Sequence, residues 1–289
     1  MLIRNPAVAG SFYPLSSNEL ASMIKRFMNE SKARPRQCMG VVAPHAGYVY
    51  CGKVFASVYS ALSGSDFDTV VILGPNHMGA GAGIATGKGM WKTPLGSVSV
   101  DEEFAGELPN NNIFNDPGAH RNEHSIEVQL PWLQAVFANK RSRFQRFVPV
   151  AINLLYYTKE HCKALGNRIA DVAEKLNRKT LVIASSDFTH HGRLYGYTPF
   201  SGSGKQILKR IKETDMEIAG YASKLMPERL VEVCRERNLS ICGFGAIAAM
   251  LWAAKRLGAK NGEILDYSTS YDVSRDTNAI VAYCGIAVF

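Results

Sequence analysis

Three histidines follow short apolar segments of the sequence. His45, His77 and His190 each come a few residues after a run of β-branched and other apolar side chains. If these runs are parallel strands of one sheet, their carboxyl ends lie at a common edge, where ligands bind in open α/β folds. Neutral imidazoles are ligands of zinc, copper, iron and nickel. Because three converging histidines are rarely all structural, the spacing predicts a metal or catalytic site.

Asp187 and His191 accompany the third histidine. Asp187 precedes His190 by three positions and His191 follows it directly, so either histidine could serve the site. Proline and glycine stand beside the other two, as in Pro44 before His45 and Gly74 before His77. Such residues form tight turns that bring backbone and imidazole close to a ligand.

Cys242 is the sulfur ligand that the sequence offers to such a site. It lies just before Gly243 and an apolar run that predicts a buried helix. A cysteine at a helix N-terminus has a lowered pKa, which favours the thiolate that binds metals. Its spacing alone favours the alternative of a small buried side chain. Gly243 and Gly245 indicate a phosphate-binding turn only weakly, because no apolar strand and no G-x-G-x-x-G pattern accompanies them.

His124 and Glu127 form a second candidate pair. A helical pattern over 123–138 would place them on one face, three positions apart. They could then support a ligand or act as acid and base. The alternative for the neighbouring Glu123 is that it only favours the positive N-terminus of that helix.

The elements that position these residues follow from hydrophobic periodicity. Five nearly continuous apolar runs predict strands, at 39–43, 69–73, 147–152, 180–184 and 279–289. Strands of this kind are covered on both faces, as in parallel sheets between helix layers. Amphipathic or apolar stretches predict helices at 16–28, 52–62, 123–138, 158–176, 228–237 and 243–257. The predicted fold is therefore an α/β protein, a three-layer α/β/α sandwich with a mostly parallel central sheet.

Residues 1–289 are predicted to form a single domain, since no repeat, linker or low-complexity tract divides them. The longest apolar run, 241–254, is too short to span a membrane. Arg4, Asn5 and Pro6 interrupt any signal-peptide core before it begins. Six cysteines without a C-x-x-C pair indicate reduced thiols and exclude a zinc ribbon. We therefore expect a soluble, cytoplasmic protein.

The formal net charge of +8 raises the possibility of an anionic partner. The basic residues are scattered, however, and form only two clusters: Lys140, Arg141, Arg143 and Arg146, then Lys205, Lys209, Arg210 and Lys212. Solvated surface explains both clusters better than nucleic-acid binding. No nucleic acid and no membrane are expected as partners, while an attraction for anionic ligands stays open.

Six blocks of the sequence resemble the Memo family, which is named for a mediator of ErbB2-driven cell motility. They are Asn-Pro-Ala-Val-Ala-Gly-Ser-Phe-Tyr-Pro at 5–14, Ala-Pro-His-Ala-Gly-Tyr at 43–48 with Tyr-Cys-Gly at 50–52, Ile-Leu-Gly-Pro-Asn-His at 72–77, Glu-His-Ser-Ile-Glu-Val-Gln-Leu-Pro at 123–131, Ser-Ser-Asp-Phe-Thr-His at 185–190 and Ile-Cys-Gly at 241–243. The blocks occur in order along nearly the whole chain, which makes the resemblance specific.

The resemblance implies a fold similar to the class III extradiol dioxygenases, which use non-haem Fe(II). It places the metal site on His45, His77 and Cys242, with Asp187 and His190 beside it. In those dioxygenases the third ligand is a carboxylate. A thiolate there is softer, so the implied cofactor is iron or copper, with zinc as a further candidate. His191 stands where relatives commonly have an aromatic residue.

Three functions follow as hypotheses. The first is a metal-dependent, redox-active protein in which His190 acts as acid or base and Asp187 orients a histidine or the substrate. The second is a metal-free hydrolase with Cys242 as nucleophile. The third is a non-catalytic module that recognises a small molecule, a peptide, an anionic ligand or a protein. For prokaryotic members the resemblance implies an AMMECR-type protein and a radical-SAM protein as partners.

Overall fold

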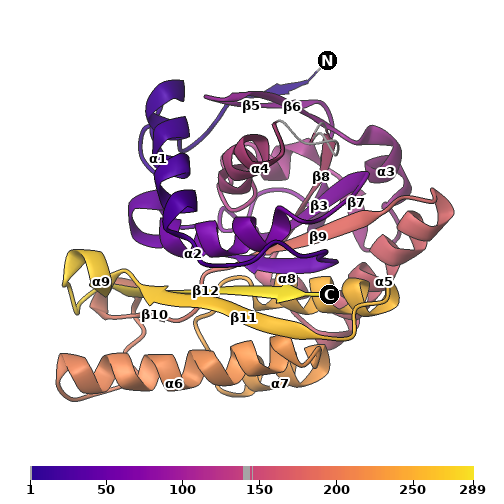
Figure 1. Cartoon of the computed structure of the whole chain (residues 1–289). Helices are drawn as coiled ribbons and strands as arrows, with labels where there is room; N and C mark the ends of the chain where they lie inside the picture. The colour runs from indigo at the N-terminus through magenta and orange to yellow at the C-terminus, as the bar shows by residue number, and fades with distance from the viewer. Residues whose placement is uncertain (1, 139–143, 145) are drawn as a thin grey trace.

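Four parallel strands form the centre of a large mixed sheet (Figure 1). They lie side by side in the order β8 (Arg146–Ile152), β3 (Thr69–Pro75), β9 (Thr180–Ser185) and β2 (Gly40–Ala43). All their residues are buried except Arg146. The computed structural model describes residues 2–138, 144 and 146–289. Each predicted apolar run thus became a strand covered on both faces.

Shorter and antiparallel strands extend the sheet on both sides. β12 (Ile280–Val288) runs antiparallel to β2 and also pairs with β11 (Gly262–Thr269) and β10 (His190–His191). On the other side lie β6 (Gly96–Val100), β5 (Met90–Thr93) and β1 (Ile3–Arg4), while β4 (Ile84–Thr86) joins β8 to β7 (Ile113–Asn115). Apart from β12, none of these strands was predicted, because they are short or mix polar with apolar residues.

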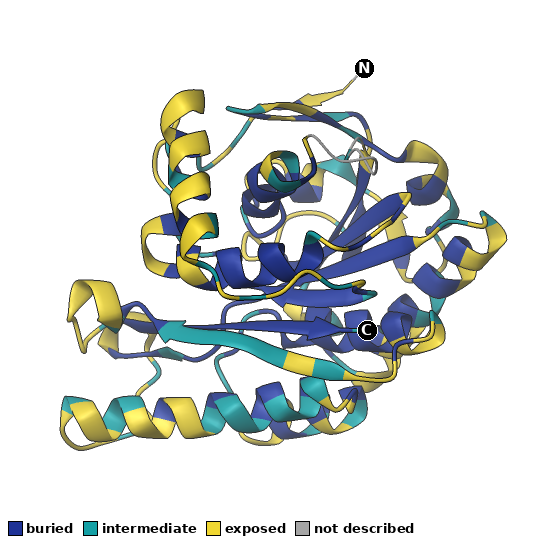
Figure 2. Ribbon diagram, viewed as in Figure 1, coloured by how far each residue is buried: buried dark blue, intermediate teal, exposed yellow. Residues whose placement is uncertain are grey.

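Helices cover both faces of the sheet and complete the three predicted layers (Figure 2). One face carries α2 (Tyr48–Leu62), against which α1 (Ser17–Glu30) and α4 (Leu130–Phe137) pack. The other face carries α8 (Phe244–Arg256) and α6 (Gly204–Ser223), with α5 (Lys159–Lys175) and α7 (Pro227–Glu236) packed against α8. The short helices α3 (Glu102–Glu107) and α9 (Tyr271–Ser274) lie in connections.

Side-chain caps fix the starts of two of the predicted helices. The Ser16 hydroxyl accepts a hydrogen bond from the Glu19 amide, and the Thr158 hydroxyl accepts one from the His161 amide. Such caps satisfy amide groups that the helix itself leaves without partners, and each stabilises a fold by about 1 kcal/mol.

The helix predicted at 123–138 was wrong over its first seven residues, 123–129. α4 begins only at Leu130, with Pro131 in its first turn, and the 3₁₀ turn Glu127–Gln129 precedes it. The Glu123 carboxylate accepts hydrogen bonds from the amides of His124 and Ser125, which fixes a turn in place of the helix. A hydrogen bond between side chain and backbone therefore overrides the apolar periodicity here.

The basic cluster at Lys205, Lys209, Arg210 and Lys212 is exposed on α6, as expected of a solvated helix face. Lys140, Arg141 and Arg143 lie outside the described residues. Within the part of the chain that the structure describes, no helix is both long and apolar enough to cross a membrane.

Candidate metal centre

His45, His77 and Cys242 come together at the carboxyl edge of the sheet. One ligand atom from each lies within 4.8 Å of the other two, and Cys242 Sγ is 3.1 Å from His45 Nε2. A shared ion would lie about 2.0–2.3 Å from each donor atom. The spacing of these three atoms is compatible with that, so the three side chains fit a transition metal. Two imidazoles and a thiol are also the donors that copper, zinc and iron prefer.

The hydrogen bonds around His45 leave its Nε2 free for a metal. Ser185 Oγ lies 3.2 Å from His45 Nδ1 and donates its hydroxyl hydrogen to the Ser125 carbonyl oxygen at 2.6 Å. Having donated that hydrogen, Ser185 Oγ can only accept the Nδ1 hydrogen of His45. Gln129 also donates to Ser185 Oγ at 2.8 Å. The imidazole is therefore held as the tautomer whose Nε2 lone pair faces Cys242.

The Glu123 carboxylate fixes His77 in the same way. Its Oε1 lies 3.0 Å from His77 Nδ1, and its Oε2 accepts from the His77 amide at 2.6 Å. Burial alone would raise the pKa of Glu123, but its hydrogen bond with His77 and the neighbouring imidazoles lower it to about 2. The carboxylate is therefore ionised and holds the Nδ1 hydrogen, which leaves His77 Nε2 for a metal.

His77, Glu123 and His124 also lie close enough to hold an ion as a group. The Glu123 oxygens, however, already bond to the amides of His77, His124 and Ser125 and to His77 Nδ1. A carboxylate used in this way has little capacity left for a cation. We therefore assign Glu123 as the support of His77, a role that the sequence pattern did not reveal.

Cys242 carries its sulfur just ahead of α8. Burial, followed by the Asp187 carboxyl, raises the pKa of this thiol well above its ordinary value. This is the opposite of the lowering expected from the helix N-terminus alone. Without a metal the side chain is thus a neutral thiol. A divalent cation bound at this point would displace the thiol proton, because the thiolate is the form that ligates metals.

His190 lies beside the same region. Three hydrogen bonds with Ser240 and one with Phe188 hold it in place. Its Nδ1 lies 3.0 Å from the Phe188 carbonyl oxygen and 3.1 Å from that of Ser240. Both carbonyls only accept, so Nδ1 carries the hydrogen and Nε2 keeps its lone pair. Ser240 Oγ also accepts from the His190 amide and donates to the His190 carbonyl oxygen.

His191 points elsewhere. Its ring stacks on Phe200 with centroids 5.9 Å apart, and its Nε2 lies 3.3 Å from the Phe200 carbonyl oxygen. Only His190 of this pair lines the cavity described below. The question that the sequence left open, whether His190 or His191 faces the site, is thus answered geometrically.

Asp187 connects the loops after β2 and β9. Its Oδ1 accepts a hydrogen bond from the His45 amide at 2.8 Å, and its Oδ2 lies 3.9 Å from His45 Nε2. Burial raises the pKa of this carboxyl, although His190 and the bond from His45 oppose the rise. Asp187 thus fixes the backbone of His45, one of the candidate ligands.

His124 belongs to the site, but Glu127 does not. The His124 ring stacks on His77 with centroids 4.8 Å apart, and burial lowers the pKa of His124 to about 4. The Glu127 carboxylate instead pairs with Arg4 at 2.7 Å and accepts from Tyr13. The predicted pairing of His124 with Glu127 was therefore wrong, because no helix forms there to align them.

A cavity of about 570 Å³ opens above the histidines. Its walls include His45, His77, His124 and His190, together with Asp187 and several aromatic rings. Cys242 lines a separate cavity of about 460 Å³ with Tyr157 and Phe244. The predicted ligand atoms thus lie between two hollows, and the larger one is wide enough for a small molecule.

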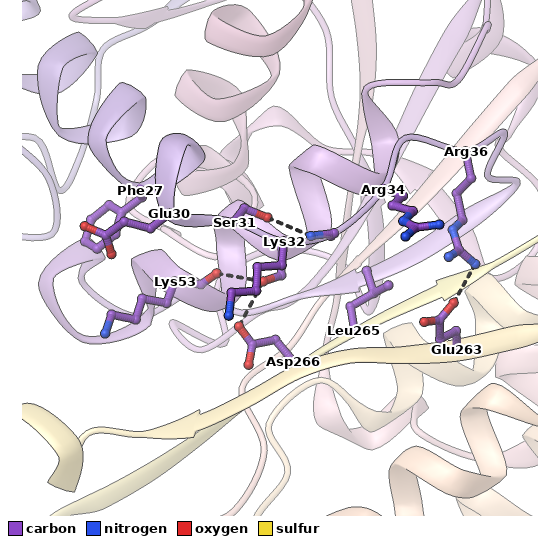
Figure 3. Close-up of a pocket in the computed structure, with 12 residues that line it drawn as sticks. Phe27, Glu30, Ser31, Lys32, Arg34, Arg36, Lys53, Glu263, Leu265 and Asp266 are labelled. Atoms are coloured by element: carbon purple, nitrogen blue, oxygen red, sulfur yellow. Dashed lines mark hydrogen bonds and ion pairs between the residues drawn. The ribbon is translucent and has the colours of Figure 1, made fainter.

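A further cavity lies between α2, β11 and the segment that follows α1 (Figure 3). Arg36 pairs there with Glu263 at 2.6 Å, and Ser57 donates to Asp266 at 2.9 Å. None of the residues predicted for the site lines this cavity. It mixes basic with acidic side chains and is distinct from the metal centre.

Comparison with known proteins identifies the family. A family model described as Memo-like protein matches residues 4–287. The chain belongs to the Memo-like family. Relatives in the same family include MEMO1 family proteins of Methanosarcina barkeri, Methanopyrus kandleri and Pyrococcus abyssi, which are 41%, 43% and 39% identical to this chain. The alignments cover 99%, 98% and 99% of this chain and 100%, 98% and 99% of those relatives. The Memo-like resemblance predicted from six sequence blocks is therefore confirmed.

Proposed function

We propose that this Memo-like chain binds one transition-metal ion through His45, His77 and Cys242 and uses it in redox chemistry on a small molecule. The observation that carries the proposal is the hydrogen bonding at the two histidines: each Nδ1 hydrogen is given to a fixed acceptor, which presents each Nε2 to one point. This support of histidine ligands is typical of metal sites.

The redox part of the proposal requires iron or copper as the resident ion, because zinc has no redox chemistry, although the same three donors also suit zinc. Bound iron or copper supplies electron-transfer chemistry and leaves coordination positions open to a substrate. The thiolate of Cys242 donates more electron density than the carboxylate of a dioxygenase-type site, which suits a softer or more reducing centre. The chain supplies the rest of the chemistry through its own side chains.

His190 is the base in this proposal. Its Nε2 has a free lone pair on the side of the cavity, and its Nδ1 hydrogen is held by carbonyl oxygens. A substrate hydroxyl or amine in the cavity could give its proton to this atom. Asp187 keeps the His45 loop in place during such a step, because its Oδ1 holds the His45 amide.

A non-catalytic binding module is the second candidate. Large apolar side chains are exposed in the helices and 3₁₀ turns that follow β2, β8, β10 and β11, namely Val49, Leu154, Leu155, Leu194 and Val273. Exposed apolar groups that gather on one side often mark a surface that binds a partner. A metal-free thiol hydrolase is less well supported, since burial keeps the Cys242 thiol protonated.

Metal analysis tests the first candidate directly. The native chain is purified without chelator, and its iron, copper and zinc are measured by mass spectrometry beside His45→Ala and Cys242→Ser. His161→Ala is the matched control, because His161 lies on α5 and contacts Tyr156 and Thr158 rather than the site. We expect about one metal ion per chain in the native and control proteins and a large loss in the other two. Equal metal content in all four proteins contradicts the proposal.

A further inference from the structure

The charge of the cavity above the metal centre differs from that of the whole chain. The sequence has a net charge of +8, yet no lysine or arginine is among the described residues that line this cavity. Its acidic residues are Asp187, which is buried, and Asp276, which is exposed and therefore marks the mouth. Arg275 precedes Asp276 in the sequence, but its guanidinium lies over the Tyr271 ring at 5.6 Å.

Aromatic side chains surround the acidic mouth. Tyr50 comes from α2 and Tyr195 from the 3₁₀ turn Arg193–Tyr195, and each is 40% exposed. Burial raises the pKa of Tyr195, and so do the nearby Asp187, Tyr50 and Asp276. These groups therefore lie close enough to interact across the opening. Phe12 and Tyr283 add apolar wall further in.

We propose that the cavity takes a small amine, with its ammonium group at the mouth between Tyr50, Tyr195 and Asp276. Aromatic ring faces attract cations, and a carboxylate beside them adds to that attraction. The apolar body of the ligand would pack against Phe12 and Tyr283. Placing the inner end of the ligand at the metal rests on the proposed function, but the charge preference at the mouth does not.

The same geometry argues against an anionic ligand in this cavity. A phosphate or carboxylate at the mouth would meet Asp276 and find no described lysine or arginine in the lining. The cavity of Figure 3 has Lys32, Arg34 and Lys53 in its lining, but Glu30, Glu263 and Asp266 line it as well. The lining at the mouth therefore gives no support to the anionic-ligand hypothesis that the sequence left open.

Three probes that share a phenol ring and differ in the charge of the outer group test the proposal. They are tyramine, 4-ethylphenol and 3-(4-hydroxyphenyl)propionate, which carry an ammonium, an ethyl and a carboxylate group. Binding to the full-length, metal-loaded protein is measured by calorimetry. We expect tyramine to bind about fivefold to tenfold more tightly than 4-ethylphenol, and the carboxylate to bind most weakly.

Substitutions at the mouth locate the preference. Asp276→Asn should weaken tyramine binding about fivefold and leave 4-ethylphenol unchanged, and Tyr195→Leu should also reduce the preference for tyramine. Asp171→Asn is the matched control, since Asp171 is exposed on α5 and pairs with Arg256. The proposal is overturned if the carboxylate binds as tightly as tyramine, if tyramine shows no binding at millimolar concentration, or if Asp276→Asn and Asp171→Asn have the same effect.

Repeating the titrations with His45→Ala separates this proposal from the proposed function. Tyr50, Tyr195 and Asp276 are not among the proposed metal ligands, so the preference for the ammonium probe should persist in a variant that has lost its metal. Metal binding without a preference for the amine rejects only the ligand proposal. A preference for the amine in a protein that never binds metal rejects only the redox function.

Discussion

Ser240 and His190 are joined by three hydrogen bonds. The Ser240 hydroxyl accepts from the His190 amide at 3.0 Å and donates to the His190 carbonyl oxygen at 2.8 Å, and the Ser240 carbonyl oxygen lies 3.1 Å from His190 Nδ1. Ser240 stands two residues before Cys242. The loop that carries the proposed base is therefore tied to the segment that carries the sulfur ligand.

Ser240→Ala should loosen this connection without removing a metal ligand. The variant loses both hydroxyl bonds but keeps the bond from His190 Nδ1 to the backbone carbonyl. We expect a loss of about 1–2 kcal/mol in the free energy of unfolding. Metal content should stay near the native value, while the NMR chemical shifts of the His190 imidazole should change. Unchanged His190 chemical shifts, or metal loss as severe as in Cys242→Ser, would contradict the assigned role.

Glu123→Gln should weaken metal binding although Glu123 is not a ligand. The amide of glutamine cannot accept every hydrogen that the carboxylate accepts from His77, His124 and Ser125. We expect metal affinity to fall about tenfold to a hundredfold, as is usual when the partner of a histidine ligand is lost. Competition with a chelator of known affinity measures this change. Glu107→Gln, on the surface of α3, serves as the control.

Glu123 should also make the fold sensitive to acid. Its pKa is lowered to about 2 in the folded chain, from an ordinary value of 4.5. A lowered pKa means that the carboxylate contributes stability above pH 4.5, and that this contribution is lost as the pH falls toward 2. The difference in unfolding free energy between the native chain and Glu123→Gln should therefore shrink over that range. A difference independent of pH would show that ionisation of Glu123 has no part in stability.

Sequence patterns indicated the proposed ligands better than the residues that support them. His45 and His77 were predicted because each ends a buried strand, whereas Cys242 has no strand before it and was assigned by family resemblance. Hydrophobic periodicity gave no signal for Ser185, Gln129 and Ser240, because a hydroxyl or amide that bonds across the fold leaves no periodic trace; Ser185 and Gln129 lie in two of the blocks that resemble the family, but the resemblance did not reveal their roles. The role of Glu123 as the support of His77 was not predicted for another reason: an acidic residue before an apolar run is equally typical of a helix start.

The secondary structure divides in the same way: elements with local sequence signals were predicted, and elements without them were not. The parallel strands and the helices α1, α5 and α7 were predicted nearly to their ends, since apolar runs and caps are local signals. β11 was missed because only its last residue, Thr269, is fully buried and its polar and apolar residues do not alternate clearly. Its place in the sheet depends on pairing with β12, a contact that no local pattern encodes.

The Cys242 thiol should react slowly when the metal is absent. Burial and the Asp187 carboxyl raise its pKa well above the ordinary value, so little thiolate is present at neutral pH. Iodoacetamide labelling of the chelator-treated protein should be slow at pH 6 and should accelerate as the pH rises. Mass spectrometry of the peptide containing Cys242 gives the rate. Rapid labelling at pH 6 that chelators and added metal leave unchanged would instead favour the hydrolase hypothesis.

Asp215 should destabilise the fold at neutral pH while holding the loop of the proposed base. This buried carboxyl accepts from the Thr189 amide and hydroxyl and from the Tyr267 hydroxyl, and burial raises its pKa from 3.8 to about 7. Between pH 4 and 7 the folded chain therefore binds a proton that the unfolded chain releases. As the pH rises through that window, Asp215 lowers the free energy of unfolding by up to about 4 kcal/mol.

Asp215→Asn separates this effect from that of His120. Burial lowers the pKa of His120 to about 4, so His120 changes the free energy of unfolding with pH in the opposite direction. The amide cannot ionise, so the variant should gain stability relative to the native chain as the pH rises from 4 to 7. Urea unfolding at several pH values measures the difference. If the difference in unfolding free energy between the two proteins stays constant with pH, Asp215 keeps an ordinary pKa. Asp215 would then accept its hydrogen bonds from Thr189 as a carboxylate over the whole pH range.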